Sequence, residues 1–291
     1  MSSGASRLSH LRSHGGFFFL GARARVRVTG ADRLRYLNGQ LSNDLRTLQS
    51  GEALPALLLT AKGKLCADLF VWMDGEALVI DAEGSLKESL LARLERYAVS
   101  DDVGFELLGD DPQQCHVFGS SHNGANGVRI RRLGVAGIDV SQTPNNVVQA
   151  TAEEVELLRI ERGIPRWGSE LSPDTLPQEA GLDQLAVDFK KGCYVGQEVV
   201  SRIHSVGRVN RRLCGFRGDF DPVKGSAARL VGPDGDRAGR LTSAAYHPEL
   251  QTTISLGYIQ TQSVDSTFSV VDQSGACLGQ AERTQFPMVS L

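Results

Sequence analysis

The sequence predicts an α+β fold that ends in a small β-barrel, and three observations point to this class. Two segments, residues 85–98 and 151–163, carry apolar side chains at helical spacing. Short alternating segments occur elsewhere, and from about Arg211 onward they are the only pattern, separated by Gly, Pro and Asp. The 32 glycines among 291 residues imply many turns. We therefore expect a mixed region of two intertwined subdomains over residues 1–208 and a C-terminal β-barrel domain over residues 209–291.

The strands of the mixed region follow from apolar runs and turns. Residues 24–29 alternate as a strand, and we expect its polar face, with Arg23, Arg25 and Arg27, to be exposed. Three apolar runs joined by two turns predict an antiparallel meander over residues 54–59, 65–72 and 77–80. Shorter strands are expected around residues 115–118 and 128–133.

The helices follow from capping and spacing. A short helix is expected over residues 31–37. Capping boxes predict the starts of the two longer helices, one formed by Ser85 with Glu88 and one by Thr151 with Glu154. The second of these should stop at Gly163, because glycine there favours a helix end. Residues 164–182 contain three prolines and are expected to form an ordered loop.

Composition excludes several classes of protein. The 31 Lys and Arg against 34 Asp and Glu give a net charge of −3, so the whole chain has no electrostatic attraction to nucleic acid or to an anionic membrane. The five cysteines form no CxxC pair, which argues against a disulfide framework or a zinc ribbon. The apolar run at residues 17–20 is too short to cross a bilayer. We expect a cytoplasmic protein, and the Arg- and Ser-rich start leaves the mitochondrial matrix as the alternative.

The most informative segment runs from Lys190 to Glu198 and contains Cys193 between two glycines. If Gly196 opens a short helix, Cys193 lies near a positive helix end with Lys190 and Lys191 alongside, a setting that lowers the pKa of a thiol. Such a thiolate can act as a nucleophile, a redox group or a transient metal ligand. The structural alternative is a buried, inert cysteine on a glycine-rich turn.

A basic segment surrounds this cysteine. From Lys190 to Arg217 there are seven Lys and Arg, and Glu198 is the only acid. Such a segment can bind carboxylates or phosphates, and the alternative is an ordinary solvated face.

KGCYVGQE, residues 191–198, followed by Arg202, resembles the signature of the folate-binding YgfZ family. These are iron–sulfur cluster assembly or repair factors related to the T-protein of glycine cleavage, an aminomethyltransferase. Further matches occur in the expected order, at residues 30–33, 43–44, 60–64, 159–165 and 176–179.

The resemblance implies a T-protein-like, aminomethyltransferase-type fold, a multi-domain ring around a central opening that binds tetrahydrofolate or a one-carbon derivative. It implies that Glu179 holds the pterin ring and that Arg208 contacts the ligand, whereas without it Glu179 would be a surface acid on a loop. The motif adds Lys191 to Cys193 as a catalytic residue and assigns folate binding to Tyr194, Gln197, Glu198 and Arg202. No metal site of the chain's own is expected, because one thiolate cannot hold a cluster that takes four ligands.

Three functions remain open at this point. The first is a tetrahydrofolate-binding accessory protein for iron–sulfur client enzymes or assembly proteins, including radical enzymes that modify tRNA. The second is a folate-dependent aminomethyltransferase, which is weakened because Lys87-Glu88 stands where T-proteins carry a Lys-Asp pair and because Glu88 is expected to cap its own helix. The third is direct tRNA binding through the basic segment, although no RNA-binding motif is visible.

Overall fold

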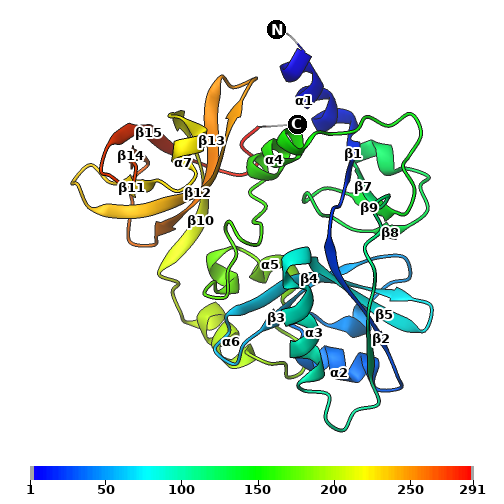
Figure 1. Ribbon diagram of the computed structural model, residues 1–291. Coiled ribbons are helices and arrows are strands. Elements are labelled where there is room, and N and C mark those ends of the chain that lie inside the picture. Colours follow the sequence, from blue (N-terminus) through cyan, green and yellow to red (C-terminus); the bar gives the residue numbers. More distant parts are fainter. Residues whose placement is uncertain (1–2, 290–291) are drawn as a thin grey trace.

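A five-stranded antiparallel sheet forms the base of the N-terminal region in the computed structural model, which describes residues 3–289 (Figure 1). Its strand order is β3-β4-β5-β2-β6. The strands are β2 (Arg23–Thr29), β3 (Leu54–Leu59), β4 (Leu65–Asp74), β5 (Ala77–Glu83) and β6 (Gly104–Leu107). The predicted meander is therefore confirmed as β3, β4 and β5.

Two helices cover one face of this sheet, α2 (Arg33–Gln40) and α3 (Lys87–Glu95). Leu37 of α2 and Leu90 and Leu94 of α3 are buried against Val26, Leu58 and other apolar strand residues. The apolar stripe of α3 thus packs against the sheet, as its helical spacing predicts. The predicted capping box at its start is wrong: Gly84–Leu86 wind into a 3-10 turn, Leu86 becomes the N-cap, and no side-chain cap bond forms there.

The opposite face carries an ionic cluster, so the prediction of an exposed arginine face on β2 is wrong for Arg25, which is buried, and for Arg23, whose side chain is 15% exposed, while the Arg27 side chain is 39% exposed. A second sheet of order β1-β7-β9-β8 packs here, formed by β1 (Gly16–Phe19), β7 (Cys115–Phe118), β8 (Val128–Arg129) and β9 (Gly137–Val140). Asp81 accepts hydrogen bonds from Arg23, Arg25 and Arg132 at 2.7–3.2 Å. Burial disfavours the charged form of Asp81, but these guanidinium groups outweigh it and hold its pKa far below the usual range.

Two more helices lie beside the second sheet, α1 (Ser3–His14) and α4 (Ala152–Glu161). The capping box of α4 is confirmed, because Thr151 Oγ1 accepts from the Glu154 amide and the Glu154 carboxylate accepts from the Thr151 amide. Leu8 and Leu11 of α1 are buried in the same apolar cluster as Leu158. The Arg- and Ser-rich start is thus a packed helix from residue 3 onward.

The C-terminal part is the closed β-barrel that the sequence predicted. Its order is β10-β13-β12-β11-β14-β15, with Phe216, Leu230 and Phe268 among the side chains that fill the interior. The strands are β10 (Arg211–Asp219), β11 (Arg229–Val231), β12 (Arg237–His247), β13 (Thr252–Gln260), β14 (Thr267–Val271) and β15 (Cys277–Thr284), and the short α7 (Pro222–Gly225) follows β10. The expected domains reach beyond the described residues at positions 1–2 and 290–291.

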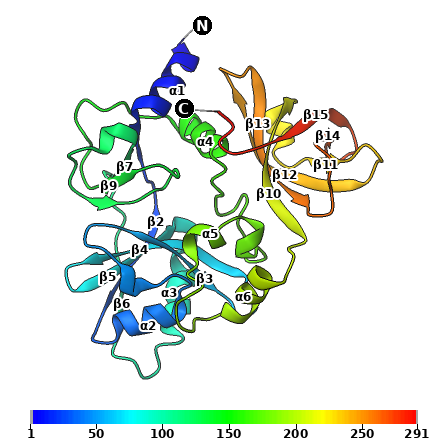
Figure 2. The same ribbon diagram turned by 180° about the vertical axis from the view of Figure 1, so that it is seen from behind.

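The two sheets and the barrel surround a central region in both ribbon views (Figures 1 and 2). The segment between α4 and the barrel enters this region and includes the 3-10 turn Pro177–Glu179, α5 (Asp183–Ala186) and α6 (Gln197–Ser205). Residues of this segment pack on Leu57, Leu59 and Leu65 of the five-stranded sheet. Among residues 3–289 no helix has the length and apolar character that a membrane crossing requires.

Candidate functional site

Cys193 lies on an exposed loop directly before α6, and its thiol is free. The prediction that Gly196 opens a helix is confirmed, since α6 begins at Gln197. Gly196 has φ +87°, and a Cβ at this position would lie 2.5 Å from the Thr60 carbonyl oxygen. Glycine is therefore required here both by conformation and by space. Gly192 is different: an added Cβ would meet nothing within 4 Å, so the tight bend depends on Gly196 alone.

The loop and α6 pack against the turn over residues 60–64. A Cβ on Gly63 would lie 3.0 Å from Cβ of Val199, and Gly63 itself borders Gly196. Two segments that matched the family pattern separately in the sequence are therefore in contact in the structure. This contact holds the Cys193 loop and the start of α6 against the turn between β3 and β4.

Lys191 anchors the Cys193 loop to the end of α2 and the segment after it. Its side chain is 5% exposed, and Nζ donates to the carbonyl oxygens of Asn38, Leu41 and Asn43, each at 2.7 Å. Burial lowers the pKa of this ammonium to about 8, although Asp44 and Asp188 oppose the shift. All of these contacts are internal, so the geometry gives Lys191 a positioning role for the loop.

Tyr194 is also buried, at 7% exposure, in the apolar cluster with Leu57 and Val200. Its hydroxyl has no hydrogen-bond partner among the described residues, and burial raises its pKa to about 12. Lys191 Nζ lies 5.4 Å from the centre of the Tyr194 ring. The two side chains on either side of Cys193 thus face inward, while the thiol faces solvent.

Glu179 lies at the end of the 3-10 turn Pro177–Glu179 and is 8% exposed. Its Oε2 accepts from the Leu176 amide at 3.2 Å and from Arg211 Nη2 at 3.0 Å. Arg208, which the resemblance assigns to the ligand, is exposed. In the sequence, Arg211 is only one of the seven Lys and Arg of the basic segment. Its position at the start of β10, beside Tyr258, is what brings it to Glu179.

The remaining predicted folate residues lie on α6. Gln178, next to Glu179, donates through Nε2 to the Val200 carbonyl at 3.0 Å, so the turn that carries Glu179 is bonded to α6. Gln197 is half-buried at the start of α6, whereas Glu198 and Arg202 are exposed. The structure thus places Glu179, Cys193 and α6 on adjoining elements and leaves Arg202 and Arg208 at the surface.

The other cysteines differ from Cys193. Cys115 and Cys214 are buried and Cys66 is half-buried, as expected for packing residues. Cys277 is exposed on β15, so it is not a packing residue. Among residues 3–289 no group of three or more His, Cys, Asp or Glu is arranged to hold a metal ion.

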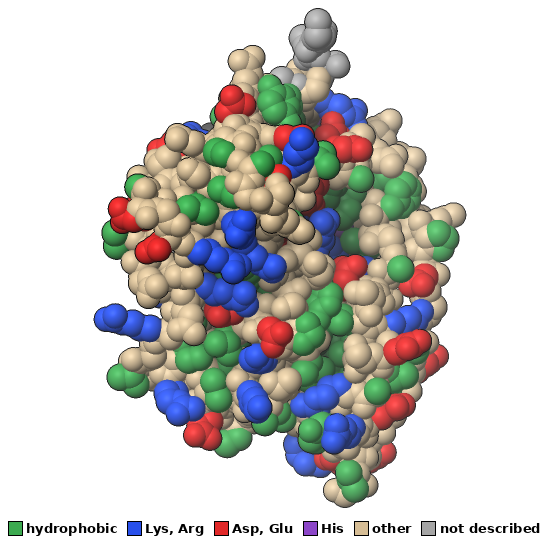
Figure 3. Space-filling model, turned by 60° about the vertical axis from the view of Figure 1, so that its left-hand side comes forward, with side chains coloured by type: hydrophobic (Ala, Val, Ile, Leu, Met, Phe, Trp, Pro, Cys, Tyr) green, Lys and Arg blue, Asp and Glu red, His purple; other side chains and the backbone are tan. Residues whose placement is uncertain are grey.

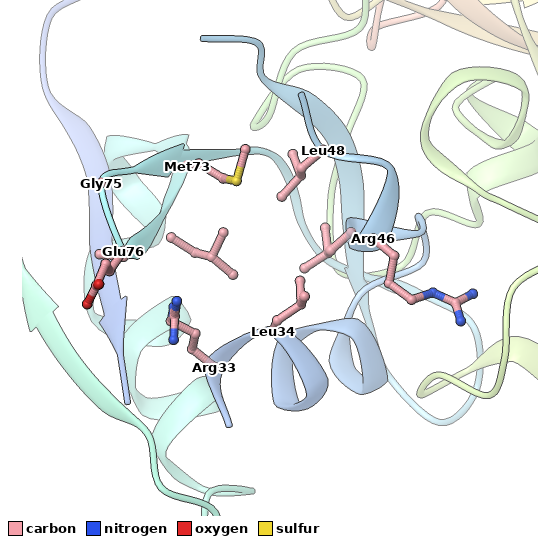
Figure 4. A pocket seen from close by; sticks show the side chains of 10 residues that line it. Arg33, Leu34, Arg46, Leu48, Met73, Gly75 and Glu76 are labelled. Atoms are coloured by element: carbon pink, nitrogen blue, oxygen red, sulfur yellow. The ribbon is translucent and has the colours of Figure 1, made fainter. Parts of the chain in front are cut away.

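A separate hollow of about 160 Å³ lies on the outer side of the five-stranded sheet (Figure 4). Its walls come from α2, the segment after it and the turn between β4 and β5, and include Arg33, Leu34, Arg46, Leu48 and Met73. None of the predicted site residues lines it. The hollow is therefore distinct from the Cys193 site.

Comparisons with known proteins relate the chain to the glycine cleavage T-protein and to the YgfZ proteins. Residues 211–289 match the family model described as the glycine cleavage T-protein C-terminal barrel domain. The chain is 28% identical to tRNA-modifying protein YgfZ of Yersinia pestis (strain Pestoides F) over 76% of this chain and 77% of that protein. It is also 28% identical to tRNA-modifying protein YgfZ of Klebsiella pneumoniae (strain 342), over 87% and 88% of the two chains. The chain is a homologue of the YgfZ proteins.

A solved structure confirms the predicted fold for this YgfZ homologue. The aminomethyltransferase T of the glycine cleavage system from Bartonella henselae superimposes with a TM-score of 0.82. The match covers 98% of this chain and 89% of that chain, at 18% sequence identity. The fold is T-protein-like and mixed α and β, and it ends in a six-stranded barrel.

Proposed function

We propose that this protein is a tetrahydrofolate-binding accessory protein that supports assembly or repair of iron–sulfur clusters in client enzymes, including enzymes that modify tRNA. The observation that carries the proposal is the Cys193 loop, on which a free thiol faces solvent while Lys191 and Tyr194 on either side are buried. An exposed thiol on an anchored loop is suited to contact with a partner protein. The tRNA-modifying names of the YgfZ relatives support the choice of client enzymes.

The unoccupied oxygen of Glu179 supports the pterin proposal. Glu179 Oε2 already accepts two hydrogen bonds within the chain, whereas Oε1 has no partner in the part of the chain that the structure describes. Oε1 can therefore accept an N–H hydrogen bond from the 2-amino-pyrimidinone edge of the ring. Arg211 keeps the carboxylate in place at 3.0 Å. Glu179 would thus hold the pterin, and the bound folate would supply a one-carbon unit near the Cys193 loop.

A cluster would have to be shared with a partner. No group of three metal-ligating side chains occurs among residues 3–289, and Cys193 offers a single thiolate. The aminomethyltransferase alternative is not favoured, because the curated relatives are named tRNA-modifying proteins, while the chain is connected to the T-protein by its fold and by the family model of the C-terminal barrel alone. Glu88 is exposed in the first turn of α3 and is not held in a capping box, so the expectation that it caps its helix is wrong.

The decisive experiment is complementation of a cell that lacks the protein. We expect Cys193→Ala to fold normally but to fail to restore the activity of iron–sulfur enzymes. Cys277→Ala is the matched control, because that thiol is also free and exposed but lies on the barrel. Restoration by Cys193→Ala equal to that by Cys277→Ala would refute the reactive-cysteine proposal.

Calorimetry tests the folate site separately. Glu179→Gln replaces one carboxylate oxygen by a donor, so we expect at least a tenfold loss of tetrahydrofolate affinity, about the value of one charge-assisted hydrogen bond. Asp174→Asn, in the same loop but with a side chain 84% exposed, should bind as the wild type does. Equal affinities of the two variants would remove Glu179 from the site.

A further inference from the structure

The hollow on the outer side of the five-stranded sheet combines an apolar wall with a charged end. Five large apolar side chains line it, those of Leu34, Leu45, Leu48, Met73 and Leu78. Leu34 and Met73 remain 40% and 38% exposed, so part of this apolar wall is uncovered. In Figure 4, Arg33 and Glu76 lie at one end of the hollow, whereas Arg46 points away from it.

The two groups at the charged end have no ionic partner. The half-buried Arg33 donates through Nη1 to the Gly30 carbonyl oxygen at 2.8 Å, and it forms no ion pair between residues 3 and 289. Glu76 is exposed, and its carboxylate accepts no hydrogen bond from the same part of the chain. A guanidinium group that is partly withdrawn from water without a counter-charge favours an added carboxylate. Arg33 and Glu76 are thus both available to a ligand.

The neighbouring charged groups are already paired. Arg27 and Asp74 line an adjoining, more open hollow, and Arg27 Nη2 lies 2.7 Å from Asp74 Oδ2. Arg46 Nη2 lies 2.6 Å from Asp44 Oδ2. This part of the surface is therefore balanced in charge, in contrast to the face in Figure 3, on part of which Lys and Arg side chains gather.

A zwitterion with an apolar side chain matches this arrangement. Its carboxylate can pair with a guanidinium group in bidentate geometry, and its ammonium group can donate to a carboxylate. An apolar cavity of about 150 Å³ holds a group of the size of benzene. The hollow, at about 160 Å³, therefore has room for one side chain of that size. A purely anionic ligand would meet repulsion from Glu76, and a purely cationic ligand would meet repulsion from Arg33.

We propose that this hollow binds a free α-amino acid with an apolar side chain of the size of leucine or methionine. The carboxylate of the amino acid pairs with Arg33, its ammonium group pairs with Glu76, and its side chain covers Leu34 and Met73. The site is independent of the proposed function, because none of the residues assigned to folate or to Cys193 lines it. Both ion pairs are near the surface, so we expect a dissociation constant on the order of 1 mM.

NMR titration of the full chain with leucine and three analogues tests this inference. 4-Methylpentanoate lacks the ammonium group, leucinamide lacks the carboxylate, and glycine lacks the apolar side chain. We expect the first two to bind the wild type about threefold more weakly than leucine, which is the value of one exposed ion pair. Glycine should bind about tenfold more weakly, because it covers no apolar surface.

Two variants assign the charges of the ligand to their partners. Arg33→Gln should weaken leucine about threefold but should not weaken leucinamide, which has no carboxylate to lose. Glu76→Gln should weaken leucine by a similar factor but should not weaken 4-methylpentanoate. Arg35→Gln is the control and should bind leucine as the wild type does, because Arg35 lies on the same helix, pairs with Asp101 at 2.5 Å and does not line the hollow.

Three outcomes would overturn the proposal. The first is that leucine shows no saturable binding up to about 10 mM, or binds no more tightly than glycine. The second is that leucine binds Arg33→Gln and Glu76→Gln with the affinity of the wild type. The third is dimerisation of the chain in analytical ultracentrifugation that Met73→Glu abolishes, without binding of leucine, which would assign the hollow to a second copy instead.

Discussion

Lys191 shows that a sequence motif can identify a residue of the site without revealing the role of its side chain. The sequence placed it beside Cys193, and the family resemblance made it catalytic. In the structure its ammonium group is buried and donates to three backbone carbonyl oxygens of residues 38–43. These carbonyls belong to the end of α2 and the segment after it, so the contact depends on how chain segments about 150 residues apart come together. Local sequence does not contain that information.

The lowered pKa of Lys191 makes a prediction about pH. Its pKa is about 8 in the folded protein against 10.5 for an ordinary lysine, so between these values the unfolded chain binds more protons. Stability from this group therefore rises as pH increases from 8 toward 10.5 and is lost progressively as pH falls from 10.5 to 8. We expect the free energy of unfolding of the wild type, measured relative to Lys191→Met, to increase by about 2 kcal/mol from pH 7.5 to 9.5. Urea unfolding of both proteins at the two pH values measures it, and a constant difference would contradict the titration.

Glu179 and Arg211 also show that contacts between distant parts of the chain are not contained in the local sequence. Glu179 was placed by the resemblance, and the structure finds its carboxylate largely buried beside the segment that carries Cys193. The arginine that contacts it is Arg211, whereas Arg208, which the resemblance assigns to the ligand, is exposed. Only two residues lie between these arginines, and the turn of the chain into β10 brings Arg211 to Glu179. The charge pattern identifies the basic segment. Which of its arginines contacts Glu179 depends on how the barrel packs against the rest of the chain.

At the scale of elements, the two capping boxes had the same sequence pattern and different outcomes. Thr151 and Glu154 form theirs at an exposed helix start, where local hydrogen bonds decide. Ser85 and Glu88 do not, because the chain leaving β5 packs tightly: a Cβ on Gly84 would lie 2.5 Å from the Ala22 carbonyl oxygen. The meander, the helical stripe and the barrel strands were predictable because each rests on periodicity. The burial of Arg25 on β2 was not, because it depends on a second sheet that brings Arg132 to the same carboxylate.

The start of α6 gives a matched pair of glycines for a stability test. Gly196→Ala places a Cβ at φ +87° and 2.5 Å from the Thr60 carbonyl oxygen, so we expect a loss of about 2–3 kcal/mol in the free energy of unfolding. Gly192→Ala meets open space and should change it by less than about 0.5 kcal/mol. Urea denaturation at equilibrium measures the free energy of unfolding of both variants. A loss in Gly196→Ala as small as that in Gly192→Ala would mean that the loop relaxes freely at Gly196.

At the scale of the whole molecule, ionic contacts join the barrel to the rest of the chain. Glu170 is buried in the segment after α4 and accepts from Arg159 of α4 at 2.9 Å. It also accepts from Thr242 and Ser243 of β12, each at 2.7 Å. One carboxylate thus connects the α4 segment to the barrel. Composition and periodicity predicted both parts but not this junction, since its members are up to 84 residues apart.

This junction yields a prediction about how the barrel is held. Glu170→Gln removes the fully buried one of the two carboxylates that pair with Arg159 and leaves only Glu156, which is partly exposed, so we expect a loss of about 2 kcal/mol in the free energy of unfolding. Asp74→Asn removes the partner of Arg27 in a pair whose side chains are 52% and 39% exposed, and should cost less than about 1 kcal/mol. Urea unfolding compares the two. Limited proteolysis should then cut Glu170→Gln first in the segment between α4 and β10, because the hydrogen bonds from Thr242 and Ser243 of β12 weaken when the charged acceptor becomes a neutral amide. Equal stability of the two variants would show that the apolar contacts of Ile254 and Leu256 with Leu158 hold the barrel without the ionic junction.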